Sequence, residues 1–220
     1  MDNALAAMGV VVVAIDFRQS PQHHYPDSVA DVNFALRWLR ANAATLNASP
    51  QSVGVFGSSS GGHLVLLNGL RPADPRYAAL SLAGVSRDSA RPDYVIVVYP
   101  ISDPLARRAY NRQVGNAAVV KSFDAYFSPA ETLQDANPQL VLDRHESVTL
   151  PPVLLLQGTA DGNGPEMQQR FAAAYRAAGG KIQLELLPGA PHNFVNMPGP
   201  NLDRALGLMK TFIGQQLAEQ

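Results

Sequence analysis

The sequence predicts an α/β domain with a mostly parallel sheet of about five strands, flanked by helices. Two patterns indicate this fold class. Short β-branched runs that are apolar on both faces recur along the chain, as in strands buried inside a parallel sheet. These runs alternate with segments of helical periodicity, an arrangement typical of parallel strands joined by right-handed crossovers. The chain has 220 residues, and because no repeat or linker divides it, we expect a single domain over residues 1–220.

Five runs fit the strand pattern, and they span residues 10–15, 52–56, 94–99, 153–157 and 181–187. The clearest of them is Val10–Ile15, a continuous apolar run that Asp16 ends. Four helices are predicted between and after the strands, over residues 28–44, 63–70, 165–178 and 202–217. Segment 103–146 contains helical pieces broken by prolines, and we expect it to form a small helical insertion over one end of the sheet.

Composition excludes several classes of protein. Hydrophobic residues make up 46% of the chain and charged residues 16%, a balance that suits a globular protein with much buried sheet. A formal net charge of −1 offers no basic surface for nucleic acid. No apolar run approaches the roughly 20 residues that cross a membrane, and without cysteine there is no disulfide framework, thiolate nucleophile or cysteine zinc site. The N-terminus lacks the basic leading region of a signal peptide, so a cytoplasmic location is favoured.

One serine-rich segment has the pattern of a nucleophile turn. Gly57-Ser58-Ser59-Ser60-Gly61 fits G-x-S-x-G with Ser59 at its centre, and it lies between a predicted strand and a predicted helix. Such a turn needs small flanking residues and points the serine hydroxyl outward above the strand ends. Ser60 and Ser58 are weaker candidates because the glycine register fits them less well. The alternative is a Ser/Gly-rich turn without chemistry, or one that binds phosphate.

A serine hydroxyl becomes a good nucleophile only when a base takes its proton. Among the five histidines, His192 stands in a loop just after the last predicted strand, at the same end of the sheet as Ser59. We therefore predict that His192 is the base. The others are expected to be surface residues or, for the one in the helix after the nucleophile, a packing residue; they are His23, His24, His145 and His63.

The base in turn needs a carboxylate that fixes its tautomer and stabilises the imidazolium. Asp161 follows the fourth predicted strand by four residues, and we predict that it orients His192. It could instead cap the helix predicted at Pro165. Asp103 and Asp135 are weaker candidates because neither directly follows a strand end. The chain order of serine, aspartate and histidine is the order found in α/β-hydrolases.

Several further segments make the resemblance specific. They are residues 14–18, 20–26, 31–39, 57–62, 99–103, 158–165 and 188–194. With these segments the chain resembles the α/β-hydrolase superfamily, and within it the carboxylesterases related to hormone-sensitive lipase and the feruloyl- and acetyl-esterase-like group. The resemblance implies a Ser59, Asp161 and His192 triad, an oxyanion hole to which the Ser60 amide contributes half, and no metal or organic cofactor.

The chain differs from that family in its N-terminal part. Members usually begin with about three more strands and a His-Gly-Gly-rich loop that supplies the other oxyanion donors, and these 220 residues contain no His-Gly-Gly stretch. The expected fold is therefore N-terminally reduced, with a second oxyanion donor still to be identified. Ser58 stands where the lipase-related branch has an acidic residue, which favours the looser esterase and dienelactone-hydrolase-like relatives.

These observations predict a serine carboxylic-ester hydrolase that acts on small, short-acyl esters through an acyl-enzyme. Two alternatives remain: an amidase or peptidase that uses the same triad, and a truncated, weakly active hydrolase fold that serves as a binding protein. The expected partner is a small-molecule ester. We also expect a homo-oligomer, because Val10–Ile15 would form an apolar sheet edge without lysine or proline.

Overall fold

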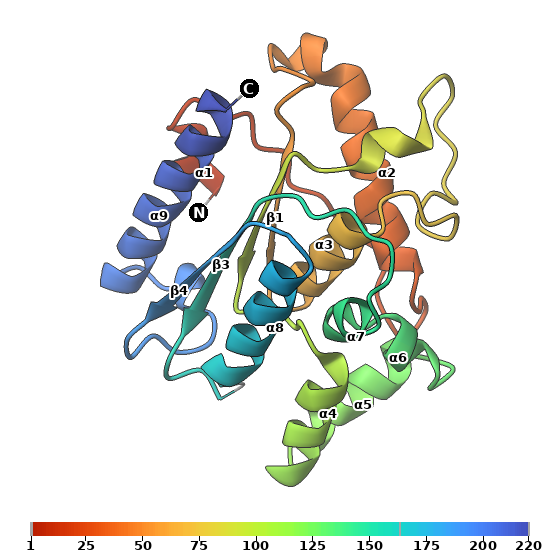
Figure 1. The fold of residues 1–220 in the computed structure, drawn as a ribbon, viewed down its shortest axis with the longest axis vertical. Helices are drawn as coiled ribbons and strands as arrows, with labels where there is room; N and C mark the ends of the chain where they lie inside the picture. Colours follow the sequence, from red (N-terminus) through yellow and green to blue (C-terminus); the bar gives the residue numbers. More distant parts are fainter. Residues whose placement is uncertain (1, 163, 220) are drawn as a thin grey trace.

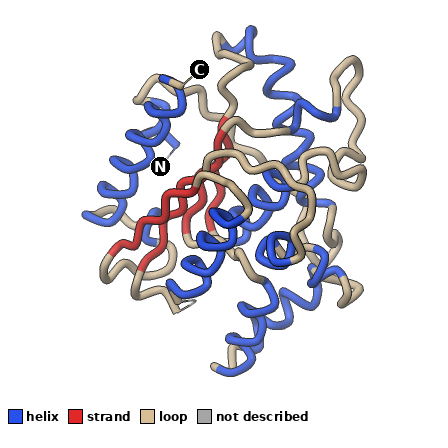
Figure 2. The backbone as a smooth tube through the Cα atoms, in the orientation of Figure 1, coloured by secondary structure: helices blue, strands red, loops and turns tan. Residues whose placement is uncertain are grey.

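The structure is a computed structural model, and it describes residues 2–162 and 164–219. Its sheet has four parallel strands in the order β1-β2-β3-β4 (Figures 1 and 2). The strands are β1 (Gly54–Ser58), β2 (Tyr94–Val98), β3 (Val153–Gly158) and β4 (Ile182–Leu187). The parallel arrangement agrees with the alternation of strands and helices in the sequence. β1 begins and ends two residues later than predicted.

Helices cover both faces of the sheet. The longer ones agree with prediction to within a few residues and are α2 (Asp27–Asn42), α3 (Ser60–Leu70), α8 (Pro165–Ala177) and α9 (Pro200–Ala218). A short α1 (Asp2–Ala6) lies beside α9 (Figure 1). Three single-turn 3₁₀ helices complete this set: η1 (Ala43–Leu46), η2 (Arg87–Ala90) and η3 (Phe194–Asn196).

Alternation along the strands divides the apolar core in two. Val95 and Val97 of β2 belong to the core that α2, α3 and α8 cover, whereas Ile96 and Val98 belong to the core that α1 and α9 cover. In β3, Leu155 points to the first core and its two leucine neighbours point to the second. All of these side chains are buried. Because burying one such side chain contributes roughly 1.5–3 kcal/mol, the sheet is held firmly from both faces.

The prediction of a strand at Val10–Ile15 is wrong. This segment has no regular secondary structure, and the sheet of the described chain has four strands instead of about five. The segment keeps a strand-like alternation: Val12 packs with the α9-side core, while Val13 and Ile15 are 40% and 38% exposed. No described strand lies beside it, however, and no backbone hydrogen bond within the described chain pairs it. A β-branched run becomes a strand only with a partner whose N–H and C=O groups it can bond.

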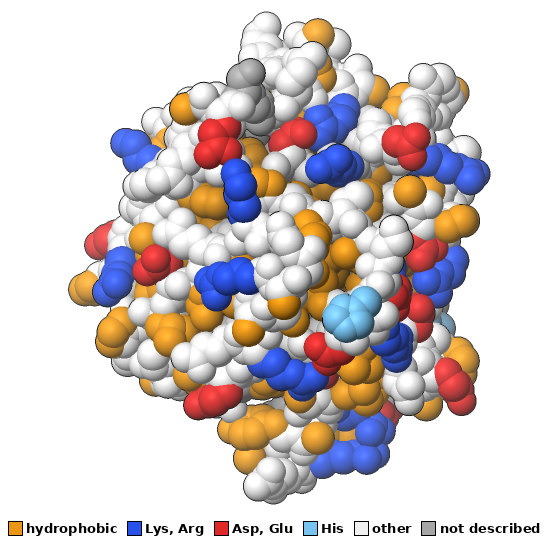
Figure 3. All heavy atoms as spheres, viewed as in Figure 1, with side chains coloured by type: hydrophobic (Ala, Val, Ile, Leu, Met, Phe, Trp, Pro, Cys, Tyr) orange, Lys and Arg blue, Asp and Glu red, His pale blue; other side chains and the backbone are white. Residues whose placement is uncertain are grey.

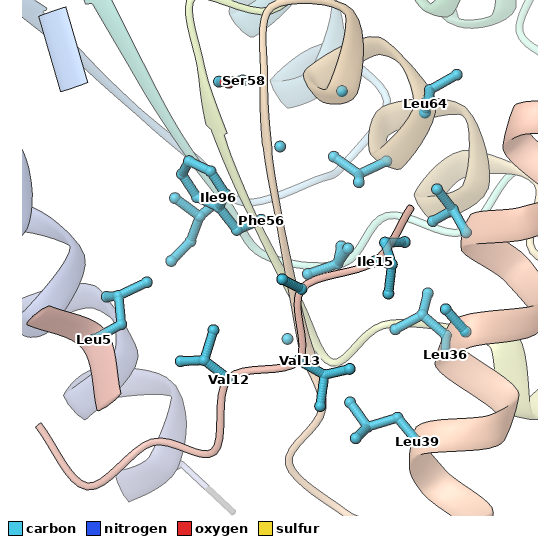
Figure 4. A pocket seen from close by; sticks show the side chains of 18 of the residues that line it. Leu5, Val12, Val13, Ile15, Leu36, Leu39, Phe56, Ser58, Leu64 and Ile96 are labelled. Carbon is cyan, nitrogen blue, oxygen red and sulfur yellow. The ribbon is translucent and has the colours of Figure 1, made fainter. Parts of the chain in front are cut away.

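A cavity of about 510 Å³ separates this segment from β1. Figure 4 shows Val13 and Ile15 facing Leu36 and Leu39 of α2 across it, with Val12 turned toward Leu5. The outer edge of β1 is therefore unpaired in the described chain, and the predicted sheet edge at Val10–Ile15 is replaced by β1 itself.

Four short helices lie within residues 104–143, and they are α4 (Pro104–Gln113), α5 (Ala117–Tyr126), α6 (Thr132–Asp135) and α7 (Pro138–Asp143). In Figure 1, α4 and α5 lie at the lower end of the molecule and α6 and α7 above them; that they form an insertion stays a prediction. Two of the prolines that divide the segment begin a helix, because proline suits the first helical position. The preceding Asp103 and Asn137 cap these helices by accepting from Ala106 N and Leu140 N, at 3.0 and 3.1 Å.

The surface carries charges of both signs. On the face drawn in Figure 3, basic and acidic side chains are interspersed among apolar ones, as expected for a net charge of −1. None of the helices in the described part of the chain has both the length and the apolar character that a membrane crossing requires.

Candidate active site

A strained turn joins β1 to α3 and presents Ser59. Its φ is 51° and its ψ is −118°, a left-handed conformation that a residue with a Cβ rarely adopts. Backbone hydrogen bonds hold the turn: Ser59 N donates to Val98 O at 3.0 Å, and Ile101 N donates to Ser59 O at 3.2 Å. Strain of this kind costs on the order of 1–3 kcal/mol and persists only where the surroundings enforce it.

The glycines of the turn have different roles. A Cβ at Gly57 would lie 2.5 Å from Gly61 O, and one at Gly62 would lie 2.7 Å from the Pro100 Cβ, so both positions exclude a side chain. A Cβ at Gly61 would meet nothing within 4 Å. The packing requirement therefore applies to Gly57 and to Gly62, which lies just outside the sequence pattern.

His192 connects Ser59 to Asp161. Its Nε2 is 3.2 Å from Ser59 Oγ, and its Nδ1 is 2.7 Å from Asp161 Oδ2. Because an ionised carboxylate only accepts, Nδ1 carries the proton and Nε2 is left free to accept from the serine hydroxyl. The Asp161 side chain is 2% exposed and that of His192 is 28% exposed, so the carboxylate is buried while the imidazole borders solvent. The three predicted residues are thus brought together at the carboxyl ends of the strands.

Two further side chains support Asp161. Gln157, the penultimate residue of β3, donates from Nε2 to Asp161 Oδ2 at 3.2 Å. Arg107 of α4 is close enough for the charge of Asp161 to act on it, although burial lowers the pKa of the guanidinium. Neither residue belongs to a sequence motif, and only the fold brings them to the site.

The other candidate carboxylates lie in different networks. Asp103 accepts from Asn137 Nδ2 at 2.9 Å in addition to capping α4. Asp135 pairs with Arg76 at 2.7 Å. Asp161 does not cap α8 either, since Gly164 holds the N-cap position.

Three of the four remaining histidines have structural partners, and the fourth is a surface residue. His23 contacts the Asp27 carboxylate at 3.0 Å, and His24 Nδ1 lies 2.6 Å from Ala125 O. His145 is exposed. His63 is buried in α3, and its ring packs edge-on against Tyr126 and Phe127.

Ser60 begins α3, one residue after Ser59. The first amides of a helix have no intrahelical acceptor and carry a partial positive charge. The Ser60 amide is therefore able to donate a hydrogen bond to a negatively charged oxygen next to Ser59.

A second cavity, of about 260 Å³, opens beside Ser60. Its walls come from the loop after Val10–Ile15, from α3 and from α5, and they include the rings of Phe17, Phe123, Tyr126 and Phe127. The larger cavity near β1 includes neither Ser59 nor His192 in its lining. Neither residue lines the smaller cavity either, and Ser60 lies in the walls of both.

Comparison with known proteins agrees with this arrangement. A family described as having the alpha/beta hydrolase fold matches residues 1–196. The chain is 30% identical to the esterase LipC of Mycobacterium tuberculosis over 96% of its own length and 52% of that protein. It is 28% identical to the ethyl acetate hydrolase of Pseudomonas putida, over 86% and 57% of the two lengths. The chain thus spans about half the length of these curated relatives.

The fold itself matches solved structures. A thermophilic esterase of Thermogutta terrifontis gives a TM-score of 0.73 at 25% identity, over 97% of this chain and 73% of that chain.

His63 makes stability depend on pH. Burial lowers the pKa of His63 to about 4 from an ordinary 6.5, opposed by its hydrogen bond to Ala136 O. The unfolded chain therefore takes up a proton as the pH falls through 6.5, whereas the folded chain takes it up only near 4. Stability is fully present above that window and is lost on acidification through it.

We expect the free energy of unfolding to fall between pH 7 and pH 4.5 by about 2–3 kcal/mol more in the wild type than in His63→Gln. Glutamine keeps a donor for Ala136 O but does not titrate. Urea unfolding at the two pH values measures the difference. His145→Gln, at an exposed position, should behave as the wild type; an equal fall in all three proteins would contradict the assignment.

Proposed function

Because the chain belongs to the α/β-hydrolase fold family, we propose that it is a serine carboxylic-ester hydrolase that works through an acyl-enzyme. The observation that carries this proposal is the relay of contacts from Ser59 Oγ through His192 to the buried Asp161. Relatives named esterase and ethyl acetate hydrolase support ester chemistry.

In the proposed mechanism Ser59 Oγ attacks the acyl carbon while His192 Nε2 takes the hydroxyl proton. His192 then gives this proton to the departing alcohol, which leaves the acyl group on Ser59. A water molecule, deprotonated by the same nitrogen, attacks the acyl-enzyme. His192 then returns this proton to Ser59 Oγ as the acid leaves, which regenerates the free hydroxyl and the neutral imidazole. Asp161 keeps the proton on Nδ1 and stabilises the imidazolium in both halves of the reaction. The Ser60 amide donates to the oxyanion.

Short acyl groups fit the proposed site best. The cavity beside Ser60 has about 260 Å³ and largely aromatic walls. Pockets for drug-sized ligands hold roughly 300–1,000 Å³, so this one is below that range. The cavity reaches Ser60, the residue after Ser59, and we propose that it takes the acyl group. We therefore propose small esters with short acyl chains as the substrate class. A cytoplasmic location and a single-domain organisation stay predictions of the sequence.

The nucleophile assignment can be tested with a fluorophosphonate probe. The esterase of Thermogutta terrifontis, 26% identical to this chain, is phosphorylated by paraoxon, so organophosphorus reagents suit this kind of site. We expect the probe to label Ser59, and Ser59→Ala to lower kcat about 10³-fold or more while the fold survives.

Ser60→Ala is the matched control, because it removes a neighbouring hydroxyl and keeps the backbone amide. It should retain labelling and most activity. Peptide mapping that places the adduct on Ser60 would overturn the assignment. Hydrolysis of anilides at rates equal to those of the matching esters would favour an amidase instead.

The leaving group of the ester should strongly affect the rate at which the 220-residue chain hydrolyses it. The tetrahedral intermediate needs two or more amide donors, and only the Ser60 amide is identified here; a missing donor costs about 10²–10³ in kcat. We expect measurable hydrolysis of p-nitrophenyl acetate and almost none of an unactivated ethyl ester. Comparing kcat on the two substrates is the test. Rates near 10–100 s⁻¹ on both would show that another amide completes the oxyanion hole.

Self-association remains a proposal, now with β1 as the exposed edge. The unpaired side of β1 faces the apolar side chains of Val11 and Val13, which are 42% and 40% exposed. Such an edge tends to pair with another chain. We expect a dimer or higher oligomer by light scattering at micromolar concentration, and a shift toward monomer in Val13→Lys. A monomeric wild type would exclude this proposal.

A further inference from the structure

We propose that Tyr99 is a positioning residue for His192, whose aromatic face holds the imidazole and stabilises its protonated form. The inference rests on the proposed function, in which His192 becomes an imidazolium. The observations that carry it are a ring contact, an inverted backbone conformation and the charges around the imidazole.

The Tyr99 ring lies directly against the base. Its centroid is 4.5 Å from that of His192, with the two planes inclined by 51°. On another side it meets Phe194 at 5.3 Å in an edge-to-face contact. Tyr99 is 2% exposed and Phe194 is 1% exposed, so neither ring has room to move away. Two contacts therefore fix the position of the His192 imidazole: Asp161 binds its Nδ1, and the Tyr99 ring packs against the imidazole ring.

A strained backbone directs the Tyr99 ring to this place. Alternation along β2 puts Val95 and Val97 in the core under α3 and α8, so the next odd residue, Tyr99, should point there as well. Instead Tyr99 and Val98 both belong to the core on the α9 side. The reason is a φ of 40° at Tyr99, which turns its side chain across the sheet.

This conformation is strained for a residue with a side chain. The backbone is held in it by Tyr99 N, which donates to Leu156 O at 2.7 Å. An asparagine or glycine would adopt the same φ with less strain. A tyrosine at this position therefore indicates a requirement for its ring.

The contact favours the charged form of the base. A cation within about 6 Å of an aromatic centroid is attracted by the negative face of the ring, and more strongly where the cation is desolvated. Imidazolium gains this attraction and neutral imidazole does not, so the transition state is stabilised more than the ground state. The other charged or titratable groups facing this region are Asp161 and, on α4 beyond it, Arg107 and Tyr110. Burial raises the pKa of Tyr99, so its phenol stays neutral.

The experiment compares Tyr99→Phe and Tyr99→Leu with the wild type. Leucine is strained at this φ as tyrosine is, so the two variants differ mainly in the aromatic face. The titration of the His192 ring is followed by NMR, with its signal assigned from His192→Gln, and kcat and KM are measured on p-nitrophenyl acetate. We expect the His192 midpoint in Tyr99→Leu to move about 0.4–1.5 pH units lower. kcat should fall about 2- to 30-fold with KM nearly unchanged, and Tyr99→Phe should match the wild type.

Tyr94→Leu is the matched control, since Tyr94 is a tyrosine at the other end of β2 that also lies in the α9-side core but packs on Phe212. This variant should be less stable than the wild type, but the pH midpoint of the His192 NMR titration should not change. If Tyr99→Leu does not fold, fluorinated phenylalanines at position 99 weaken the negative ring face while preserving its shape. The His192 midpoint should then fall as fluorines are added.

Three results would overturn the proposal: an unchanged His192 titration in Tyr99→Leu, a midpoint independent of fluorination, or a Tyr99→Phe variant as impaired as Tyr99→Leu. The last result would assign the effect to the phenol, which lies beside Ser58. A wild type without esterase activity would refute the proposed function, whereas the NMR titration would still decide whether Tyr99 stabilises the charged ring.

Discussion

The parallel register of the first three strands is the constraint on which the site depends. Ser58 of β1 is aligned with Val98 of β2, and Val98 is aligned with Leu156 of β3. The next residue of each strand therefore emerges at one level, which brings Ser59, Tyr99 and Gln157 side by side. Backbone hydrogen bonds from Ser59 N to Val98 O and from Tyr99 N to Leu156 O carry this alignment past the ends of the strands. This register sets the level at which Ser59 and Tyr99 leave the sheet, and it places Gln157, which donates to Asp161, beside them.

Two neighbouring strands are each followed directly by a residue with positive φ, and the strain is concentrated where the chemistry is proposed. Ser59 has a φ of 51° and Tyr99 a φ of 40°. Each conformation turns a side chain out of the direction that strand alternation would give it. The close packing of Gly57 and Gly62 explains how the first turn is accommodated. A well-buried sheet, with leucines and valines on both faces, provides the stability that such local strain requires.

The sequence was sufficient to predict the residues whose position follows from chain order. Ser59, Asp161 and His192 each follow a strand, and parallel strands end at a common edge, so their proximity could be predicted before the fold was seen. Val10–Ile15 was mistaken for a strand because composition reports burial and β-branching but not the presence of a partner strand. Tyr99 and Arg107 could not be assigned either, since one depends on a backbone inversion and the other on how α4 packs over the sheet.

The free outer edge of β1 has a consequence for local stability. Amides of an edge strand that lack an acceptor are the first to exchange with solvent, and sheets open most easily from an unpaired side. In this chain the strand at that edge is also the one that leads into Ser59. Fraying at this edge would thus begin beside Ser59, while β2 and β3, each paired on both sides, stay intact. The Ser59 turn would then be lost in a local opening that precedes global unfolding, so heat would abolish the proposed activity before it melts the core.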